Sequence, residues 1–251
     1  MLAHSELVAL ERENFMACYR ALAEAAPGGS VRDEVGVFAF ATGLSMPMFN
    51  GCIITDPDHT SGLGEALTWV AEHDLPYTLW VPGIVPDEVD ALAAEHGLAR
   101  EPQPLPGMVL NPVPASPALP PGLVIEPAGT GRESDFARVV VGLGLGEETA
   151  AQLTSPSFVA RADVDLFVGY LDGAPVGTSV AVSSAGAGGV VNVLTLEEAR
   201  GRGVGTAMTW AAAQASVTRG HNTVVLQATP MGLPVYRSMG FETVVEYAEF
   251  A

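Results

Sequence analysis

Five prolines within twelve residues, Asn111–Gly122 (NPVPASPALPPG), constrain this chain more than any other feature of its sequence. Proline lacks a backbone N–H and fixes its φ angle, so such a run forms an extended, semi-rigid linker. The 251 residues therefore divide into parts of about 110 and 130 residues, each an ordinary size for a domain. We predict one domain at 1–113, a linker at 114–122 and a second domain at 123–251.

The chain is strongly acidic, with a formal net charge of −18, and its eleven basic residues are all arginine. Residues 1–113 carry −12 (16 acidic, 4 basic) and the remainder carries −6 (13 acidic, 7 basic). Such a charge repels nucleic acid and anionic membranes and accommodates a cationic small molecule, although general solubility explains it equally well. No apolar run reaches the length of a membrane span and no secretory signal pattern occurs, so we expect a cytoplasmic protein.

The two cysteines, Cys18 and Cys52, lie 34 residues apart in the first part of the chain. Neither a disulfide framework nor a zinc-binding spacing follows from that arrangement. We expect buried structural thiols and no bound metal.

The second part alternates strand-like and helix-like patterns in an order that predicts a mixed α/β fold. The dipeptide Asp172-Gly173 indicates a hairpin turn between two of the strands. Strands are expected at 123–128, 164–172, 175–184, 189–196, 223–229 and 241–250, and helices at about 133–145, 146–153, 203–218 and 233–239.

The first part has a less distinct pattern, but its later elements follow the same order as the end of the second part. This order suggests a distant internal duplication, in which Gly97-Leu98 corresponds to Gly240-Phe241. Helices are expected at about 4–26, 62–74 and 86–98, and strands at about 35–41, 48–54, 76–81 and 107–110.

The segment Arg200–Thr206 (RGRGVGT) separates an apolar strand from a long helix. Its three glycines let the backbone approach a ligand closely, and the following helix start presents unpaired N–H groups. Together they form a cradle for a pyrophosphate, to which Arg200 and Arg202 add positive charge. A tight turn without a ligand is the alternative. The spacing matches neither G-x-G-x-x-G nor the phosphate-loop signature, so a dinucleotide or nucleoside triphosphate is not expected.

The same segment resembles the acetyl-CoA signature Arg/Gln-x-x-Gly-x-Gly/Ala of the GNAT N-acetyltransferase superfamily, with Arg200, Gly203 and Gly205 at its fixed positions. VLTLEEARGRGVGTAM resembles the fourth strand and third helix of that fold. TVVLQATPMGLPVYRSMGFE resembles its fifth strand, its fourth helix and its ending Tyr-x-x-x-Gly-Phe. The resemblance covers 123–251 and implies a mixed, mostly antiparallel sheet flanked by helices.

The resemblance also implies roles for individual residues. The fourth and fifth strands of the family splay apart, and backbone groups of the fourth pair with the pantetheine arm like an added strand. The implied coenzyme site comprises Val193, Leu194, Thr195, Arg200, Gly201, Arg202, Gly203, Val204, Gly205, Thr206 and Thr229. Tyr236 is implied to lie near the coenzyme sulfur, where a tyrosine O–H (reference pKa about 10) protonates a departing thiolate. A packed aromatic is the alternative for Tyr236.

The sequence departs from the family pattern at three points. Glu197 and Thr229 stand where many members have proline and asparagine. The segments that correspond to the fourth and fifth strands, 189–196 and 223–229, contain no carboxylate that would serve as a general base. Glu197, Glu198 and His221 are candidates, but each fits an ordinary surface residue better, so we assign no base and expect the amine to lose its proton to water.

The first part lacks the signature, and its nearest glycine-rich piece, Ser61–Glu65, has no arginine and places a carboxylate at a helix start. We interpret this part as a degenerate GNAT-like domain, which either walls the acceptor site or mediates homodimerisation.

The sequence thus predicts two GNAT-like α/β domains and an N-acetyltransferase that uses acetyl-CoA and no metal. The acceptor would be a primary amine of a small molecule or peptide, attacking directly in a ternary complex. The alternatives are an acyl-CoA-binding sensor without turnover, and another reaction on the same fold, such as acyl-CoA decarboxylation.

Overall fold

A computed structural model describes residues 2–184 and 186–251 and groups the chain into two compact units. Unit 1 combines the residues up to Cys18 with Met108–Glu242, and unit 2 combines Tyr19–Gly107 with Thr243–Ala251. Each unit is built from two separate stretches, whereas the sequence predicts two continuous domains. The difference arises because the start of the first helix and the last strand each pack with the opposite half of the sequence. The domain boundaries at 113 and 123 remain a prediction.

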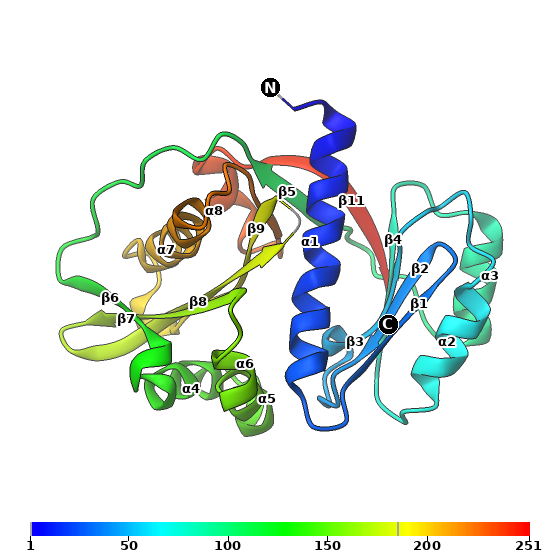
Figure 1. Cartoon of the computed structure of the whole chain (residues 1–251), viewed down its shortest axis with the longest axis horizontal. Helices are drawn as coiled ribbons and strands as arrows, with labels where there is room; N and C mark the ends of the chain where they lie inside the picture. The colour runs from blue at the N-terminus through cyan, green and yellow to red at the C-terminus, as the bar shows by residue number, and fades with distance from the viewer. Residues whose placement is uncertain (1, 185) are drawn as a thin grey trace. The chain divides into compact units, whose positions relative to one another are not determined.

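The secondary structure follows the expected order (Figure 1). The helices are α1 (His4–Ala25), α2 (Leu63–Ala71), α3 (Asp87–Glu95), α4 (Glu133–Gly142), α5 (Gly146–Leu153), α6 (Pro156–Val159), α7 (Val204–Thr218) and α8 (Leu233–Ser238). The strands are β1 (Ser30–Glu34), β2 (Val37–Ala41), β3 (Asn50–Ile54), β4 (Thr78–Pro82), β5 (Leu105–Leu110), β6 (Leu123–Pro127), β7 (Val164–Leu171), β8 (Ala174–Ser184), β9 (Ala187–Thr195), β10 (Val224–Gln227) and β11 (Glu242–Phe250). Three 3-10 turns are η1 (Pro47–Phe49), η2 (Ala128–Thr130) and η3 (Glu197–Ala199).

Every predicted helix and strand is present, with ends that agree within three residues. The sequence analysis missed β1 and the short α6. β1 reads SVRDE and lies at the edge of the described sheet, paired with β2 alone. Four of its five residues are half-buried and one is exposed, and the segment shows no hydrophobic alternation. The predicted turn at Asp172-Gly173 is confirmed: both residues have positive φ, 52° and 81°, as a tight two-residue hairpin turn requires.

Unit 2 has the strand order β1-β2-β3-β4-β11. β3 and β4 run parallel, and the other neighbours run antiparallel. One hydrophobic cluster joins α2 and α3 to the sheet, including Leu67, Val70 and Val89. A second group of aromatic rings packs around Tyr19, which stacks on Phe40 with ring centroids 4.0 Å apart.

Unit 1 has the strand order β5-β10-β9-β8-β7-β6. β6 to β9 form an antiparallel meander, and β10 runs parallel to β9. Figure 1 shows α7 on one side of these strands and α4, α5 and α6 on the other. α7 approaches the sheet closely because the sheet has glycines beneath it: a Cβ at Gly169 or Gly177 would lie within 2.8 Å of a side chain of α7.

The beginning of α1 covers the face of unit 1 opposite α7. A Cβ at Gly188 would meet Ser216 of α7, whereas a Cβ at the next residue, Gly189, would lie 1.9 Å from Oδ1 of Asn14. Successive residues of a strand point to opposite faces, so α7 and α1 lie on opposite sides of β9. The buried Asn14 amide donates to Val182 O at 3.0 Å and to Ser184 Oγ at 2.8 Å, which fixes α1 on β8.

Two strands, β5 and β11, pack with the half of the sequence to which they do not belong. β5, from the first half, lies beside β10 in unit 1, where Met108 and Leu110 belong to the same hydrophobic cluster as Val224 and Leu226. β11, from the second half, pairs with β4 in unit 2, with Phe250 opposite Leu79. The strands of the first half are therefore completed by β11, and those of the second half by β5.

We expect residues 123–251 alone not to fold stably, although the linker makes this fragment the natural one to express. The fragment lacks β5 and α1, and loss of a buried residue as large as Met108 or Leu110 costs about 2–5 kcal/mol. Thermal unfolding followed by far-UV circular dichroism should show no cooperative transition for the fragment. The full chain is the control, and a fragment that melts cooperatively at the same temperature would show that the exchanged strand is dispensable.

Candidate functional site

The hydrogen bonding between β9 and β10 ends soon after it begins. Only Val224 with Gly188 and Val225 with Gly189 are in register, while β9 continues to Thr195. A bulge in β9 lies beyond the paired stretch, where Asn192 and Val193 face the single residue Ser179 of β8 and Asn192 has a φ of 50°. Bulges bend a strand and increase its twist, so the two strands diverge at this point.

The divergence opens a cavity of about 880 Å³. It contains all the predicted site residues except Arg202, which is exposed: Val193, Leu194, Thr195, Arg200, Gly201, Gly203, Val204, Gly205, Thr206, Thr229 and Tyr236. The sequence analysis did not single out the other lining residues, Leu143, Leu145, Ala199, Thr209, Pro230, Met231, Gly232 and Val235. Leu143 and Leu145 follow α4, in a segment without any recognisable chemical motif.

The glycine-rich segment forms one end of the cavity. Gly201 and Gly203 have φ angles of 71° and 77°, a left-handed conformation that residues with a Cβ rarely adopt. Gly203 precedes α7 directly, and no side chain in the described part of the chain caps this helix start. The first N–H groups of α7 therefore face the cavity without an intrahelical acceptor, and the helix dipole makes this end electropositive. The arrangement suits an anion such as a phosphate.

Arg200 lies beside this helix start with its guanidinium partly engaged. Its NH1 forms a 3.3 Å ion pair with Glu197, and its Nε donates to Thr195 O at 3.4 Å. The Glu197 carboxylate is 82% exposed, so the pair is weakly held and Arg200 is free to turn to a stronger anionic partner.

Tyr236 forms the opposite wall from α8. Its half-buried ring packs edge-on against Phe241, with centroids 5.9 Å apart, and burial raises the pKa of the phenol to about 12. The hydroxyl therefore keeps its proton at neutral pH and can donate it. Gly232 makes room for the ring, because a Cβ there would lie 2.7 Å from Cε2 of Tyr236.

Thr229 lines the cavity but its side chain also has a structural task. Its Oγ1 accepts from Gly232 N at 3.3 Å, and its carbonyl accepts from Leu233 N at 2.9 Å, so it stabilises the turn that leads into α8. The hydroxyl proton is still available to a ligand, whereas the oxygen is partly occupied.

The structure brings none of the candidate bases to the cavity. Glu197 and Glu198 are exposed on η3, and His221 follows α7, away from the lining. Among the described residues that line the cavity, none is Asp, Glu or His. Likewise, within 2–184 and 186–251 no three His, Cys, Asp or Glu side chains are placed to hold a metal ion, and no helix is long and apolar enough to cross a membrane.

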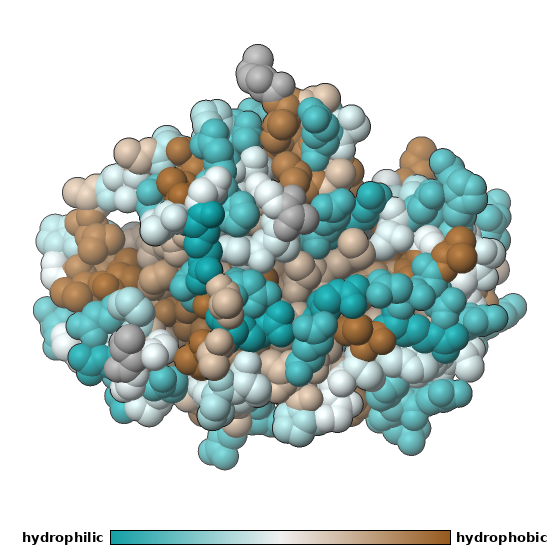
Figure 2. Space-filling model, viewed as in Figure 1, coloured by the Kyte–Doolittle hydropathy of each residue, from teal (hydrophilic) through white to brown (hydrophobic). Residues whose placement is uncertain are grey.

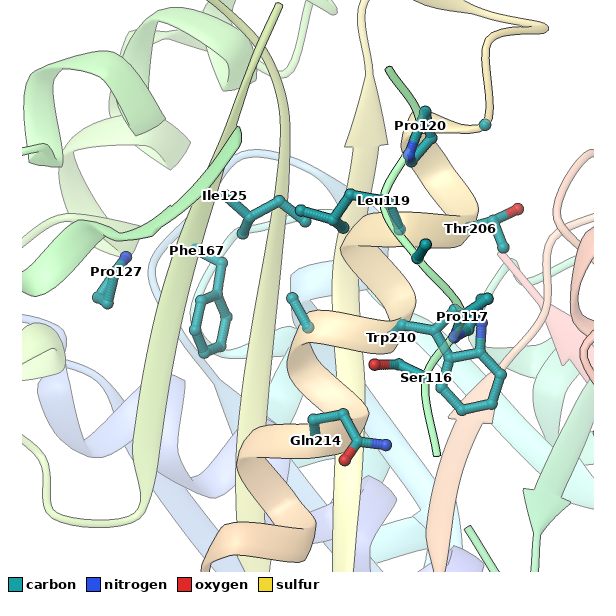
Figure 3. Close-up of a pocket in the computed structure, with 14 residues that line it drawn as sticks. Ser116, Pro117, Leu119, Pro120, Ile125, Pro127, Phe167, Thr206, Trp210 and Gln214 are labelled. Carbon is teal, nitrogen blue, oxygen red and sulfur yellow. The ribbon is translucent and has the colours of Figure 1, made fainter. Parts of the chain in front are cut away.

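A second cavity, of about 480 Å³, lies beneath the proline-rich segment (Figure 3). It shares Gly203 and Thr206 with the first cavity. Figure 3 shows Leu119 and Ile125 pointing toward one another across it, with Phe167 alongside and Gln214 at its far end. The Gln214 side chain donates to Pro114 O at 3.0 Å and so ties the segment to α7. The surface in Figure 2 is mainly hydrophilic, with apolar residues gathered at the end of unit 1 that carries β6 and β7.

Unit 2 has no comparable cradle at the corresponding helix start. β3 and β4 stay paired at three successive positions, from Gly51 with Thr78 to Ile53 with Trp80. The start of α2 is covered, because a Cβ at Gly62 would lie 2.7 Å from Cβ of Glu34. Glu65 in the first turn of α2 pairs with Arg32 at 3.4 Å, and its charge disfavours a phosphate there.

Comparisons with known proteins agree with this geometry. Residues 162–243 match the family model described as the acetyltransferase (GNAT) domain. No curated protein sequence matches the chain. Among solved structures, the chain is similar to a GCN5-related N-acetyltransferase from Kribbella flavida, with 19% identity, 95% of this chain and 94% of that chain covered, and a TM-score of 0.67.

Two further solved structures are similar in fold. A tandem GNAT protein from the clavulanic acid biosynthesis pathway has 17% identity, covers 99% of this chain and 96% of its own, and gives a TM-score of 0.58. A GCN5-related N-acetyltransferase from Sphaerobacter thermophilus has 20% identity, 86% and 76% coverage, and a TM-score of 0.57. These likenesses confirm the predicted GNAT-like α/β fold, in which a mixed, mostly antiparallel sheet is flanked by helices.

We expect Tyr236 to remain protonated well above the pH at which a free tyrosine ionises. An unfolded chain loses this proton near pH 10 and the folded chain only near the raised pKa of about 12. The Tyr236 contribution to stability is therefore constant below pH 10 and decreases as the pH rises from about 10 to 12. The ¹³Cζ resonance of Tyr236, assigned with Tyr236→Phe, should stay unshifted to about pH 11. A midpoint at pH 10 or lower would contradict the assigned burial.

Proposed function

We propose that the chain, whose residues 162–243 form a GNAT acetyltransferase domain, moves an acetyl group from acetyl-CoA to a primary amine of a small molecule or peptide. The observation that carries the proposal is the gap between β9 and β10, with an electropositive helix start at one end and a protonated tyrosine at the other. Those two features suit the two ends of an acyl thioester bearing a pyrophosphate.

The donor is proposed to lie along β9. Its pyrophosphate would accept hydrogen bonds from backbone N–H groups between Gly201 and Thr206, with Arg200 and Arg202 nearby. Beyond Gly189 the edge of β9 that faces the gap has no strand partner among the described residues, so Val193, Leu194 and Thr195 present backbone groups there. A pantetheine arm, with its two amides, suits that edge as an added strand. The second cavity adjoins the same helix start and offers apolar walls to the adenosine end.

The proposed reaction is a direct transfer in a ternary complex. The lone pair of the neutral amine attacks the thioester carbonyl carbon, and the C–S bond breaks as the amide forms. The leaving thiolate takes the proton of Tyr236 Oη, and the proton lost by the amine nitrogen passes to water, from which Tyr236 is reprotonated. Holding the two reactants together supplies much of the rate, because it converts a bimolecular step into an effectively unimolecular one.

Acetyl-CoA should bind the full chain, and the double variant Arg200→Glu, Gly203→Glu should bind it about 100-fold more weakly or not at all. Each carboxylate repels the pyrophosphate, and the second fills the space that only glycine leaves at a φ of 77°. Isothermal titration calorimetry with acetyl-CoA and CoA measures the loss. Arg138→Glu, on the exposed face of α4, is the matched charge control and should bind normally. If the wild-type chain does not bind acetyl-CoA, the proposed function is wrong.

Tyr236→Phe should lower kcat by about 100-fold or more without changing the affinity for acetyl-CoA, because it removes only the proton donated to the leaving sulfur. Thiol release during an amine-library screen measures the rate. Tyr170→Phe is the matched control, since its phenol also has a pKa raised to about 12 but lies outside the cavity. Normal turnover by Tyr236→Phe would show that the tyrosine takes no part in the reaction. A wild-type chain that binds acetyl-CoA but acetylates no amine would favour a sensor.

A further inference from the structure

The cavity between β9 and β10 reaches both faces of the sheet. Successive residues of extended backbone point to opposite faces, so Thr195 and Leu196 face different helices. A Cβ on Gly205 of α7 would lie 3.4 Å from Oγ1 of Thr195, and a Cβ on Gly142, the last residue of α4, would lie 2.9 Å from Cδ2 of Leu196. Figure 1 shows α4 and α7 on opposite sides of these strands. The lining accordingly combines residues of α7 with residues that follow α4.

The two sides of the cavity differ in chemistry. The α7 side holds the glycine-rich segment and the helix start, and Arg200 is the one charged side chain among the described lining residues. On the α4 side the lining consists of Leu143 and Leu145. A further apolar lining residue, Met231, lies on the loop before α8 and is 68% exposed. Apolar side chains that stay accessible at a cavity are typical of a site for an apolar group.

The turn between α4 and α5 holds the two leucines at the cavity. It reads GLGLG (142–146), and Gly144 and Gly146 have φ angles of 79° and 84°. The N–H groups of Gly144 and Leu145 donate to carbonyls in the last turn of α4, at 2.9 and 3.3 Å. Leu143 and Leu145 are both half-buried, so each keeps apolar surface that a bound molecule can remove from water.

The direction from which the donor enters leaves the α4 side to the second substrate. In the proposed complex the pyrophosphate occupies the helix start of α7, and the pantetheine arm follows the free edge of β9 into the gap. An acceptor that attacks the thioester carbonyl must then come from the other face. Its amino group lies at the carbonyl, and the rest of the molecule lies on Leu143 and Leu145.

We propose that Leu143 and Leu145 select the acceptor by its body, and that the acceptor is an amine with an aliphatic or aromatic body and no second charge. The inference rests on the proposed function and narrows its substrate class at the same site. Hydrocarbon that covers the two leucines leaves water, which favours binding. A second ammonium group on the same surface would leave water for a wall on which no described lining residue is an anion.

The acidic residues that follow the two leucines in sequence do not reverse this preference. Glu147 and Glu148 lie in the first turn of α5, are exposed, and are not among the residues that line the cavity. Exposed charges interact weakly with a distant group because water and salt screen them. Together with the net charge of −18 they draw ammonium ions toward the protein, but the contact inside the cavity is with leucine.

The test compares hexylamine with hexamethylenediamine, which has the same hydrocarbon chain and a second amino group at its end. Hydroxylamine serves as a small acceptor without an apolar body. Each acceptor is assayed with acetyl-CoA on the full chain, and calorimetry measures the affinity for acetyl-CoA. The variants are Leu143→Asn and Leu145→Asn, which make the side chain polar at similar size. The matched controls are Val141→Thr, at an exposed position of α4 outside the cavity, and Glu147→Gln.

We expect the wild type to use hexylamine with a kcat/KM about 10-fold or more above that for hexamethylenediamine. Each leucine variant should raise the KM of hexylamine by about 10-fold, the scale for part of one buried leucine side chain. The KM of hexamethylenediamine, the KM of hydroxylamine and the affinity for acetyl-CoA should each change less than about twofold. The preference for hexylamine should therefore largely disappear in both variants, and both controls should match the wild type.

Four results would overturn the inference. The first needs no variant: a wild type that binds acetyl-CoA but uses hexamethylenediamine as well as hexylamine, or acetylates neither. The second is an unchanged KM of hexylamine in both leucine variants. The third is a parallel loss for hydroxylamine and acetyl-CoA, which would show a purely structural role. The fourth is a loss with hexanoyl-CoA as donor but none with hexylamine as acceptor, which would assign the leucines to the acyl group.

Failure of the proposed function has a different signature. A wild-type chain that does not bind acetyl-CoA would reject the transferase itself, whereas every result above is obtained with a chain that binds it.

Discussion

The early end of hydrogen bonding between β9 and β10 is the constraint on which the rest of unit 1 depends. Two residue pairs hold the strands together, and the bulge at Asn192 and Val193 then turns β9 away. Had the ladder continued, the backbone groups of β9 would be satisfied within the sheet and no cavity would pass between α7 and the loop that carries Leu143. The proposed binding of the pantetheine arm uses backbone of β9 that the sheet leaves unpaired.

The features that the sequence predicted correctly are those that depend on a few neighbouring residues. Glycines at positive φ, an uncapped helix start and a strand with continuous apolar character were readable at Gly201, Gly203 and the residues around them, because their causes lie within a few positions of one another. The edge strand β1 was missed because its sequence lacks such a local pattern. SVRDE pairs on one side only, and its residues do not distinguish a strand from a loop. The predicted roles of the site residues stay predictions.

Long-range placement was beyond the sequence. No pattern in the sequence around Glu11 or Gln227 indicates that these two side chains, 216 residues apart, form a 2.6 Å hydrogen bond. The candidate bases that the sequence offered, Glu197, Glu198 and His221, all lie near the glycine-rich segment or the fifth strand, whereas the buried carboxylate Glu11 lies on the first helix. In the same way the pattern predicted β5 and β11 as strands, but the alternation of apolar and polar residues carries no information about which neighbour a strand will choose.

The exchange of β5 and β11 has a consequence for biosynthesis. β4 is made early, but its neighbour β11 begins 160 positions after Pro82 (242 − 82). At translation rates of about 5–20 residues per second, the edge of β4 waits on the order of 10–30 s for its partner. An apolar edge with Leu79 and Val81 is a template for unwanted pairing during that interval. The topology therefore leaves this apolar edge unpaired in the nascent chain, although it is paired in the finished protein.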